Sequence, residues 1–418
     1  MNILLINTNR FKTPPAIPIG LEYIITALRN KGHEVSLLDL YFSNNPCKDI
    51  ESKILKTNPD VIGMSIRQID SVLYKNNEYF LDDIIEYVLL CKMLGKRVIL
   101  GGAGFSIMPG EILAATHADY GISGPGDKAI IYVLDELVKK DINGPVLING
   151  NDHLIDVHMA VERNIDLDYD SYIKDGSIVG FMTQTGCTEK CIYCPERLTP
   201  LCIRDPDAVA RELAHLHKKG YSNLHLCDSE FNMHLDIAIQ ICDSIIEQVP
   251  PIKWTLYMKP EPFNEELFVK LKRSGAYLIT LTLDTKPQRP YSLKRLTEFF
   301  ACAKSHEIKV IVDLLTGFPY EDKAKAKEFI SFLDTQPISS VGINNYFRIY
   351  AHTPLARIIE KDESLHTFCI NYTPGTDFLK PVFFNYFSDK DILDMIEASK
   401  IMKLEGMEKR SNYQRLKD

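Results

Sequence analysis

The chain has 418 residues, 45% of them apolar and 25% charged, so it is long enough for two or three domains with ordinary globular cores. The net charge of −8 argues against the basic surface that usually marks a nucleic-acid-binding protein. The sequence has no apolar run of about 18 residues that would predict a membrane span, and its start lacks the basic residues of a signal peptide. Ten cysteines are too dilute for a disulfide scaffold, so a reducing, cytoplasmic location is expected.

Residues 1–145 alternate between predicted strands and helices. Leu21, Ile24, Ile25 and Leu28 recur at helical spacing, and Gly32 follows where a helix would end. Strand-to-helix alternation predicts a parallel sheet with helices on both faces, which is a doubly wound, Rossmann-like domain. The predicted strands cover residues 2–7, 33–40, 61–66 and 97–100, with a second helix around residues 81–94.

Three strand exits in this half carry loops that are rich in glycine or polar residues, at 65–70, 101–106 and 121–127. Ligands bind at the carboxyl ends of the strands in such sheets, and glycine lets the backbone approach a large planar ligand closely. The same glycines could equally serve only to reverse the chain. The run at 101–104 lacks the full G-x-G-x-x-G spacing of a dinucleotide site.

Residues 146–175 show no periodicity and are predicted to be a linker. Residues 176–350 return to alternating strands and helices, which predicts a partial (β/α)6 barrel with functional loops at the carboxyl ends of its strands. The six expected strands lie at 176–185, 223–227, 253–257, 277–283, 309–315 and 341–346. Residues 351–418 are predicted to form a lid or helical extension, with an aromatic segment at 378–387 and a charged helix at 402–418.

Cys187, Cys191 and Cys194 form a Cys-x3-Cys-x2-Cys array at the start of the predicted barrel. Grouped thiolates select zinc or iron–sulfur clusters. A closed zinc site needs four protein ligands, and no nearby His or Cys has suitable spacing to supply the fourth. Three cysteines on a cluster instead leave one iron open for a substrate or cofactor. The other seven cysteines are scattered singly, and each is predicted to be a small buried apolar residue.

This array, with the strand before it and Tyr193 between its last two cysteines, resembles the radical S-adenosylmethionine (SAM) enzymes. There, three such cysteines hold a 4Fe-4S cluster, and SAM binds the open iron through its amino and carboxylate groups. Asp228 and Glu230 keep the acidic character of the family's Gly-Gly-Glu-like turn without its glycines, and either could instead cap a loop. Arg348 could lie near the site or cap the barrel. The SAM-binding residues that the resemblance implies are Tyr193, Asp228, Ser229, Glu230, Asp284, Gly317 and Pro319.

The first half, including residues 14–23 and 32–35, is similar to the cobalamin-binding domain fused ahead of many radical SAM barrels. The Asp-x-His-x-x-Gly motif is absent, so no histidine is offered as the lower ligand of cobalt. Gly124 to Asp127 replaces the expected Gly-Glu-Gly-Glu-like turn, which leaves open a domain that kept this fold but lost cobalamin. The cobalamin-binding residues that the resemblance implies are Ser65, Arg67, Gln68, Gly101, Gly102, Gly104, Phe105, Ser106, Gly124 and Gly126.

The two resemblances together imply a cobalamin-dependent radical SAM enzyme. The expected reaction is methylation of an unactivated carbon of a small molecule, lipid or peptide, with two SAM per turnover and an external donor such as flavodoxin or ferredoxin. A radical rearrangement or cyclisation is the alternative among enzymes, and a cobalamin or SAM sensor is the alternative outside them. Methylthio transfer to tRNA is disfavoured because the first half lacks the three cluster cysteines of those enzymes.

Overall fold

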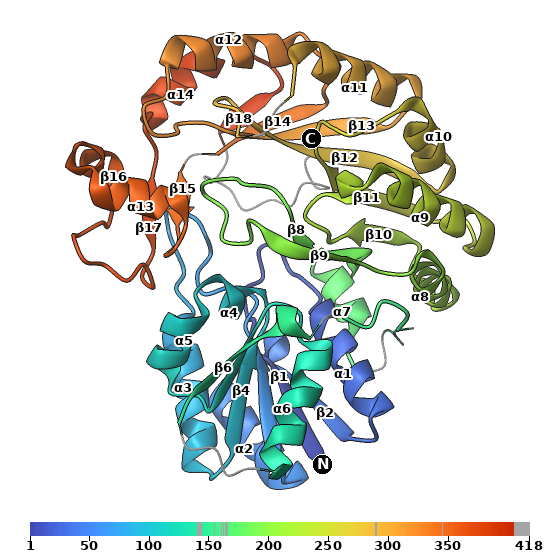
Figure 1. Ribbon diagram of the computed structural model, residues 1–418, viewed down its shortest axis with the longest axis vertical. Coiled ribbons are helices and arrows are strands. Elements are labelled where there is room, and N and C mark those ends of the chain that lie inside the picture. The colour runs from blue at the N-terminus through green and yellow to red at the C-terminus, as the bar shows by residue number, and fades with distance from the viewer. Residues whose placement is uncertain are drawn as a thin grey trace. The chain divides into compact units, whose positions relative to one another are not determined.

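The computed structural model describes residues 1–139, 144–153, 155–159, 161, 163, 166–288, 291–344 and 346–404. The chain divides into two compact units (Figure 1). The first unit comprises residues 1–71 and 77–177, and the second comprises residues 72–76 and 178–418. Within the described residues no helix is long and apolar enough to cross a membrane.

The first unit contains a six-stranded parallel sheet with the strand order β2-β1-β3-β4-β5-β6, so the predicted doubly wound fold is confirmed. Its strands are β1 (Asn2–Asn7), β2 (Glu34–Asp39), β3 (Val61–Ser65), β4 (Arg97–Gly101), β5 (Tyr120–Ser123) and β6 (Val146–Asn149). The order reverses at β1, whose neighbours are β2 and β3, and such a reversal is where ligands bind in open sheets of this kind.

Helices cover both faces of this sheet (Figure 1). On one face α1 (Ile19–Asn30) and α6 (Asp127–Lys139) share a buried apolar core with Leu5 of β1 and Ile99 of β4. The remaining helices of the unit are η1 (Leu40–Phe42), α2 (Pro46–Thr57), α3 (Leu81–Met93), α4 (Ala103–Ile107), α5 (Pro109–Thr116), η2 (Gly150–Asp152) and α7 (Tyr169–Lys174).

The predicted linker, residues 146–175, is built into the first unit. It supplies β6, and the buried guanidinium of Arg163 pairs with Glu22 of α1 at 2.6 Å. The hydroxyl of Tyr169 donates to the same Glu22 carboxylate and accepts from Arg163. Removing one partner of such a buried ion pair strongly destabilises a protein, because the other charge is left unpaired. These contacts therefore fix the segment to α1. The first unit therefore extends to Ser177 rather than ending at residue 145.

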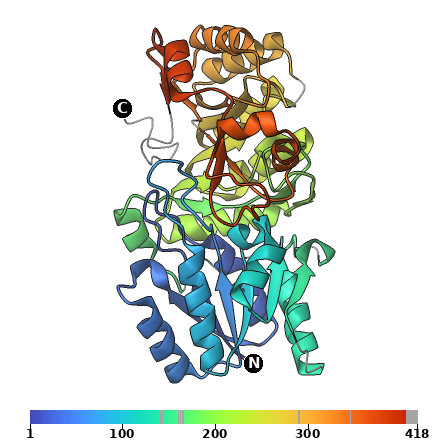
Figure 2. The same ribbon diagram turned by 90° about the vertical axis from the view of Figure 1, so that its left-hand side faces the viewer.

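The second unit contains a seven-stranded parallel sheet, and the predicted partial barrel is confirmed. In spatial order its strands are β7 (Val179–Phe181), β10 (Asn223–Leu226), β11 (Lys253–Met258), β12 (Ala276–Asp284), β13 (Lys309–Leu315), β14 (Ser340–Ile343) and β18 (Met402–Leu404). Figures 1 and 2 show helices along the outside of this sheet. These are α8 (Pro206–Lys218), α9 (Leu235–Gln248), α10 (Glu265–Arg273), α11 (Leu293–Ser305) and α12 (Lys323–Asp334), and a buried turn η3 (Phe231–Met233) precedes α9.

Two expectations for this unit were wrong. Met402–Leu404 form the edge strand β18 against β14 rather than a helix, and residues 405–418 lie outside the described residues. The strand expected over 176–185 is two strands, since the chain turns after β7 into an antiparallel hairpin of β8 (Gln184–Cys187) and β9 (Thr199–Ile203).

The C-terminal extension carries a small antiparallel sheet, in the order β15-β17-β16. Arg348 of β15 is buried and donates to the carbonyl of Phe378 at 3.0 Å and that of Leu379 at 3.2 Å, so it braces the aromatic segment. The elements of the extension are β15 (Phe347–Ile349), α13 (Pro354–Lys361), η4 (Glu363–Phe368), β16 (Cys369–Ile370), β17 (Val382–Phe384) and α14 (Asp389–Ile396).

Residues 72–76 belong to the second unit although the residues on either side of them belong to the first. The hydroxyl of Tyr74 donates to Asp389 at 2.6 Å, and its ring centroid lies 4.4 Å from that of Tyr346. The ammonium group of Lys75 lies 3.2 Å from the same carboxylate.

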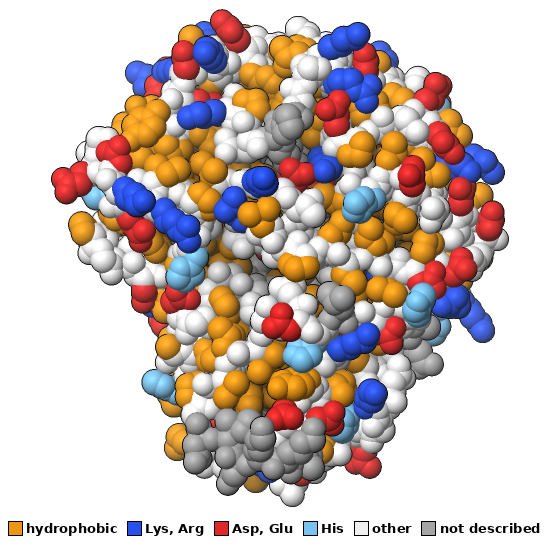
Figure 3. Space-filling view, viewed as in Figure 1, with side chains coloured by type: hydrophobic (Ala, Val, Ile, Leu, Met, Phe, Trp, Pro, Cys, Tyr) orange, Lys and Arg blue, Asp and Glu red, His pale blue; other side chains and the backbone are white. Residues whose placement is uncertain are grey.

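On the face of the molecule seen in Figure 3, basic and acidic side chains are interspersed.

Candidate cluster and cofactor sites

The three cysteines of the Cys-x3-Cys-x2-Cys array line one pocket of about 310 Å³ in the second unit. Cys187 ends β8, and Cys191 and Cys194 lie in the connection between β8 and β9. The other walls of the pocket are Glu189, Tyr193, Glu196, Arg197, Asp228, Ser229, Glu230, Tyr257 and Thr282.

Local contacts hold the hairpin that carries the cysteines. The amide of Cys187 donates to the hydroxyl of Thr199 at 2.8 Å, and the amide of Leu198 donates to the carbonyl of Glu189 at 3.1 Å. Gly186 has a φ of +88°, and a Cβ there would lie 2.0 Å from the carbonyl oxygen of Pro200, so only glycine fits. The carboxylate of Glu189 also pairs with Lys259 at 2.6 Å.

The chemistry of this wall fits an iron–sulfur cluster. Within the described part of the chain, no group of three or more His, Cys, Asp or Glu side chains gathers closely enough to hold a single metal ion. The three thiolates of a 4Fe-4S cluster bind different irons, so they surround a volume rather than a point. Burial raises the pKa of the Cys194 thiol to about 12, so this thiol carries a proton until a metal displaces it.

Four of the seven expected SAM-binding residues lie on the wall of the same pocket, namely Tyr193, Asp228, Ser229 and Glu230. The other three, Asp284, Gly317 and Pro319, are not among the described residues that line it. The Asp284 carboxylate is nevertheless close to the wall, because it accepts a long hydrogen bond of 3.5 Å from the hydroxyl of Tyr193.

Gly317, at the exit of β13, packs against the C-terminal extension. Its φ is +84°, and a Cβ there would lie 1.7 Å from Oδ1 of Asn385. Its amide and that of Phe318 donate to Oε2 of Glu321, at 2.7 and 2.9 Å. The carbonyl of Pro319 accepts from Lys286 at 2.8 Å. The sequence did not predict the contact with Asn385, which lies 68 positions along the chain and belongs to no motif.

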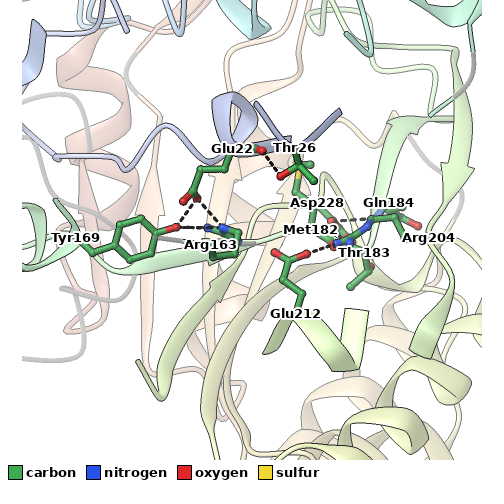
Figure 4. Close-up of polar contacts among 10 residues, drawn as sticks. All are labelled: Glu22, Thr26, Arg163, Tyr169, Met182, Thr183, Gln184, Arg204, Glu212 and Asp228. Atoms are coloured by element: carbon green, nitrogen blue, oxygen red, sulfur yellow. Dashed lines mark hydrogen bonds and ion pairs between the residues drawn. The ribbon is translucent and has the colours of Figure 1, made fainter. Parts of the chain in front are cut away.

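Asp228 is buried, and its carboxylate is already bound by the protein (Figure 4). Its Oδ1 accepts from the amides of Thr183 at 2.8 Å and Gln184 at 3.3 Å, and its Oδ2 accepts from the hydroxyl of Thr183. Burial raises the pKa of Asp228 to about 6, against the opposing effect of these hydrogen bonds. Of the two readings offered by the sequence, the contacts favour the capping one for this residue.

The raised pKa of Asp228 predicts a pH-dependent effect of Asp228→Asn. Because the folded pKa of about 6 is above the ordinary value of 3.8, the stabilisation from this group is complete below pH 3.8 and is lost as pH rises through 6. Between pH 5 and pH 8 ionisation of Asp228 therefore lowers the free energy of unfolding of the wild-type protein by about 1.4 kcal/mol. The uncharged variant does not show this loss. Denaturant unfolding of both proteins at the two pH values measures this. If the unfolding free energies of wild type and variant differed by the same amount at pH 5 and at pH 8, the prediction would be contradicted.

The first unit has an apolar pocket of about 140 Å³ between the sheet and helices α1 and α6. It reaches the carboxyl ends of β3, β4 and β5. Five of the expected cobalamin-binding residues line it, namely Ser65, Gly101, Gly102, Gly124 and Gly126. The remaining walls, which were not among the expected cobalamin-binding residues, include Leu5, Gly20, Leu21, Ile24, Ile99, Ile122 and Ile130.

The other five expected residues have different surroundings. Phe105 is fully buried, and its ring lies 2.2 Å from the position that a Cβ on Gly121 would take, so it fills the interior of the unit. Ser106 joins two of the turns, because its hydroxyl donates to the carbonyl of Gly102 at 3.0 Å and accepts from the amide of Gly124 at 2.9 Å. A Cβ on Gly104 would lie 2.5 Å from the amide nitrogen of Gln68, and Arg67 donates to the Gln68 side chain at 2.8 Å.

The carboxyl ends of β1 and β2 are closed by the protein itself. Asn7 donates to Asp39 at 2.7 Å, and the hydroxyl of Tyr172 from α7 donates to the same carboxylate at 2.9 Å. The ring of Tyr172 stacks on that of Tyr41, with the centroids 4.3 Å apart. These contacts occupy the ends of β1 and β2, whereas the apolar pocket reaches the ends of β3, β4 and β5.

Comparison with known proteins gives two family matches. The B12 binding domain model matches residues 13–133, and the radical SAM superfamily model matches residues 181–333. The tryptophan 2-C-methyltransferase of Streptomyces laurentii is 22% identical and covers 85% of this chain and 74% of its own length. An uncharacterized methyltransferase of Pyrococcus horikoshii is 22% identical and covers 75% of this chain and 72% of its own length.

The fold is also that of a solved enzyme, the radical S-adenosylmethionine methyltransferase TsrM from Kitasatospora setae. Its structure with tryptophan substrate and a SAM analog matches with a TM-score of 0.85 at 21% identity, over 99% of this chain and 93% of that one. Its structure with cobalamin and a 4Fe-4S cluster matches with a TM-score of 0.82 at 20% identity, over 95% and 91%. At this identity the likeness shows the fold.

Proposed function

The chain belongs to the radical SAM enzymes that carry a B12-binding domain, and we propose that it methylates carbon in a small molecule with the help of cobalamin. The strongest support is the pocket in which three cysteines of one hairpin meet Tyr193 and Glu230, inside the segment that matches the radical SAM superfamily. Cys187, Cys191 and Cys194 would hold the 4Fe-4S cluster, and the rest of the pocket would take SAM at the open iron.

When bound, the reduced cluster supplies the electron that cleaves SAM, and cobalamin carries the methyl group. The chain's own residues bind, orient and exclude water. Glu230 is 3% exposed and lies on the pocket wall, so its carboxylate suits the amino group of SAM. Tyr193 forms an aromatic wall with Phe318 and Phe347, with ring centroids 6.0 and 5.5 Å from its own, and such a wall keeps water from the site.

The first unit fits cobalamin in two respects. Its apolar pocket of about 140 Å³ is close to the roughly 150 Å³ cavity that holds benzene in another protein, so it suits one aromatic group such as the base of the nucleotide tail. The Nε2 atom of Gln68 is buried without a hydrogen-bond partner. Gln68 follows Ser65, a residue of the pocket wall, by three positions, and its Nε2 would donate to an amide side chain of the corrin. Gly101, Gly102 and Gly124 would line the approach.

The products of reconstituted protein test the proposal. With SAM, reductant, cobalamin and tryptophan as the first probe substrate, we expect one S-adenosylhomocysteine and one 5′-deoxyadenosine for each methylated product. A flavodoxin or ferredoxin should replace the chemical reductant. Other small molecules, lipids and peptides would follow tryptophan as probes, because the relative's substrate belongs to a protein only 22% identical.

Other product patterns would support other functions. Formation of 5′-deoxyadenosine alone, with cobalamin bound, would favour a rearrangement or cyclisation. S-adenosylhomocysteine alone would leave methyl transfer but remove the second SAM from the scheme. Binding of SAM and cobalamin without either product would favour a sensor.

A further inference from the structure

The short connection between β7 and β8 has its backbone held from two sides by charged residues. After Phe181 the chain leaves the parallel barrel sheet and enters the antiparallel hairpin that carries the cysteines. On one side, the buried carboxylate of Asp228 accepts the amide of Thr183 at 2.8 Å, the amide of Gln184 at 3.3 Å and the Thr183 hydroxyl. Figure 4 shows these contacts around a single side chain.

Arg204 holds the carbonyl groups of the same connection. Its guanidinium donates to the carbonyl of Met182 at 2.8 Å, and its own backbone amide donates to the carbonyl of Thr183 at 2.8 Å. Glu212 of α8 pairs with the guanidinium at 2.8 Å, and the two side chains are only 2% and 1% exposed. The charge of Arg204 is thus compensated by Glu212 while its donors reach the backbone (Figure 4).

These contacts give hydrogen-bond partners to the backbone groups of the turn, where the hydrogen bonds of the parallel sheet end. The amides of Thr183 and Gln184 and the carbonyls of Met182 and Thr183 are all bound to Asp228 or Arg204. Buried backbone groups without partners are costly, so removing either side chain releases the connection. Cys187 follows Gln184 by three residues in the short strand β8, so the position of the connection sets where this strand and its cysteine begin.

We propose that Asp228 is a positioning residue that acts with Arg204 on the Met182–Gln184 connection, fixes the cysteine hairpin and does not hold SAM through its charge. The inference rests on the proposed function for the identity of the cluster. Glu230 is the other acidic residue of this loop on the pocket wall, and the side chain of Gln184 donates to its backbone carbonyl at 2.6 Å.

Three variants separate the two roles of the acidic loop. Asp228→Asn keeps an oxygen for the two amides and places its NH2 group beside the Thr183 hydroxyl, which can turn to accept. Asp228→Ala removes all of these partners. Glu230→Gln is the matched control, because it neutralises the other carboxylate and keeps the backbone carbonyl that accepts from Gln184.

The variants are compared as anaerobically reconstituted full chains. Iron per chain and the electron paramagnetic resonance signal of the reduced cluster report on the hairpin, and equilibrium binding reports on SAM. We expect Asp228→Asn to keep its iron, its resonance signal and a SAM Kd within about twofold of wild type. Asp228→Ala should lose most of its iron, and Glu230→Gln should keep its iron while its SAM Kd rises about tenfold or more.

The inference is overturned if Asp228→Asn weakens SAM about tenfold while its iron and resonance signal are unchanged. It is also overturned if folded Asp228→Ala keeps full iron and an unchanged signal. Should Asp228→Ala not fold, Thr183→Val decides, since it removes one hydroxyl donor and keeps the shape. An altered resonance signal with unchanged SAM affinity supports the inference, and an unchanged signal contradicts it. Because iron and resonance are read without methylation, failure of the proposed reaction is seen separately.

Discussion

Changing Cys187, Cys191 and Cys194 together to alanine should reduce the iron of reconstituted protein from about four atoms per chain to background. The three thiols are the cysteines on the wall of one pocket, and the hairpin that carries them is shaped by local contacts that do not need metal, such as the close packing at Gly186. The variant should therefore fold but lose the visible absorbance of the cluster. Iron analysis and absorbance, with circular dichroism for the fold, give the result.

Cys202→Ala is the matched control, since Cys202 lies in β9 of the same hairpin but not on the pocket wall among the described residues. It should keep its iron. Iron retained by the triple variant would mean that other side chains hold the cluster, and the assignment of the site would be wrong.

Gly20→Leu should abolish cobalamin binding without harming the fold. Gly20 lines the apolar pocket, and a Cβ added there meets nothing within 4 Å, so leucine enters the space that the ligand needs. The residue is second in helix α1, where leucine is a better helix former than glycine by several tenths of a kcal/mol. At a hundredfold excess over its Kd, cobalamin should stabilise the wild-type chain by about 2.7 kcal/mol and should leave the variant unchanged.

Gly110→Leu serves as the control because Gly110 is also second in its helix, α5, and has nothing within 4 Å of an added Cβ. It is absent from the described wall of the pocket and should bind cobalamin normally. The visible spectrum of bound cobalamin should be that of a base-off form in wild type, since the nucleotide base would lie in the apolar pocket instead of on cobalt and no histidine motif supplies a replacement ligand. Equal cobalamin binding by Gly20→Leu and wild type would place the ligand elsewhere.

Replacing Gly102 or Gly104 with valine is the test of cobalamin binding that the sequence alone would suggest. In the folded chain these substitutions would disturb the loops themselves, so they would report on folding and not on the ligand. A Cβ at Gly102 would lie 2.6 Å from the carbonyl oxygen of Ile66, and one at Gly104 would lie 2.5 Å from the amide nitrogen of Gln68. These glycines let one loop pack on the next, and bulk there disturbs the loops whether or not a ligand is present.

Sequence periodicity predicted the strands that are long and apolar, such as Asn2–Asn7 and Lys309–Leu315, with the bounds seen in the structure. It missed β6, because four residues with two exposed side chains carry too little pattern to separate them from a loop. The cysteine spacing pointed to a single pocket because all three residues are local in the chain.

The role of Asp228 could not be read in the same way. The acidic residue itself indicates a strand exit, but its hydrogen-bond partners Thr183 and Gln184 lie about 45 positions away and belong to no motif. The same holds for Gly317, whose missing side chain makes room for Asn385 rather than for a ligand. A sequence shows which groups can bind a cofactor, and only the folded chain shows which of them the protein has already used.

The five residues 72–76 bear on how such a protein can be rebuilt. The chain enters the second unit, returns to the first and leaves it again, so no single cut separates the two. A barrel begun at Ile178 would lose Tyr74, and with it the donor to Asp389 and the ring against Tyr346. To exchange the B12-binding half for that of a relative, residues 72–76 must therefore be kept with the barrel that they belong to. The exchange then replaces two segments, 1–71 and 77–177, instead of one.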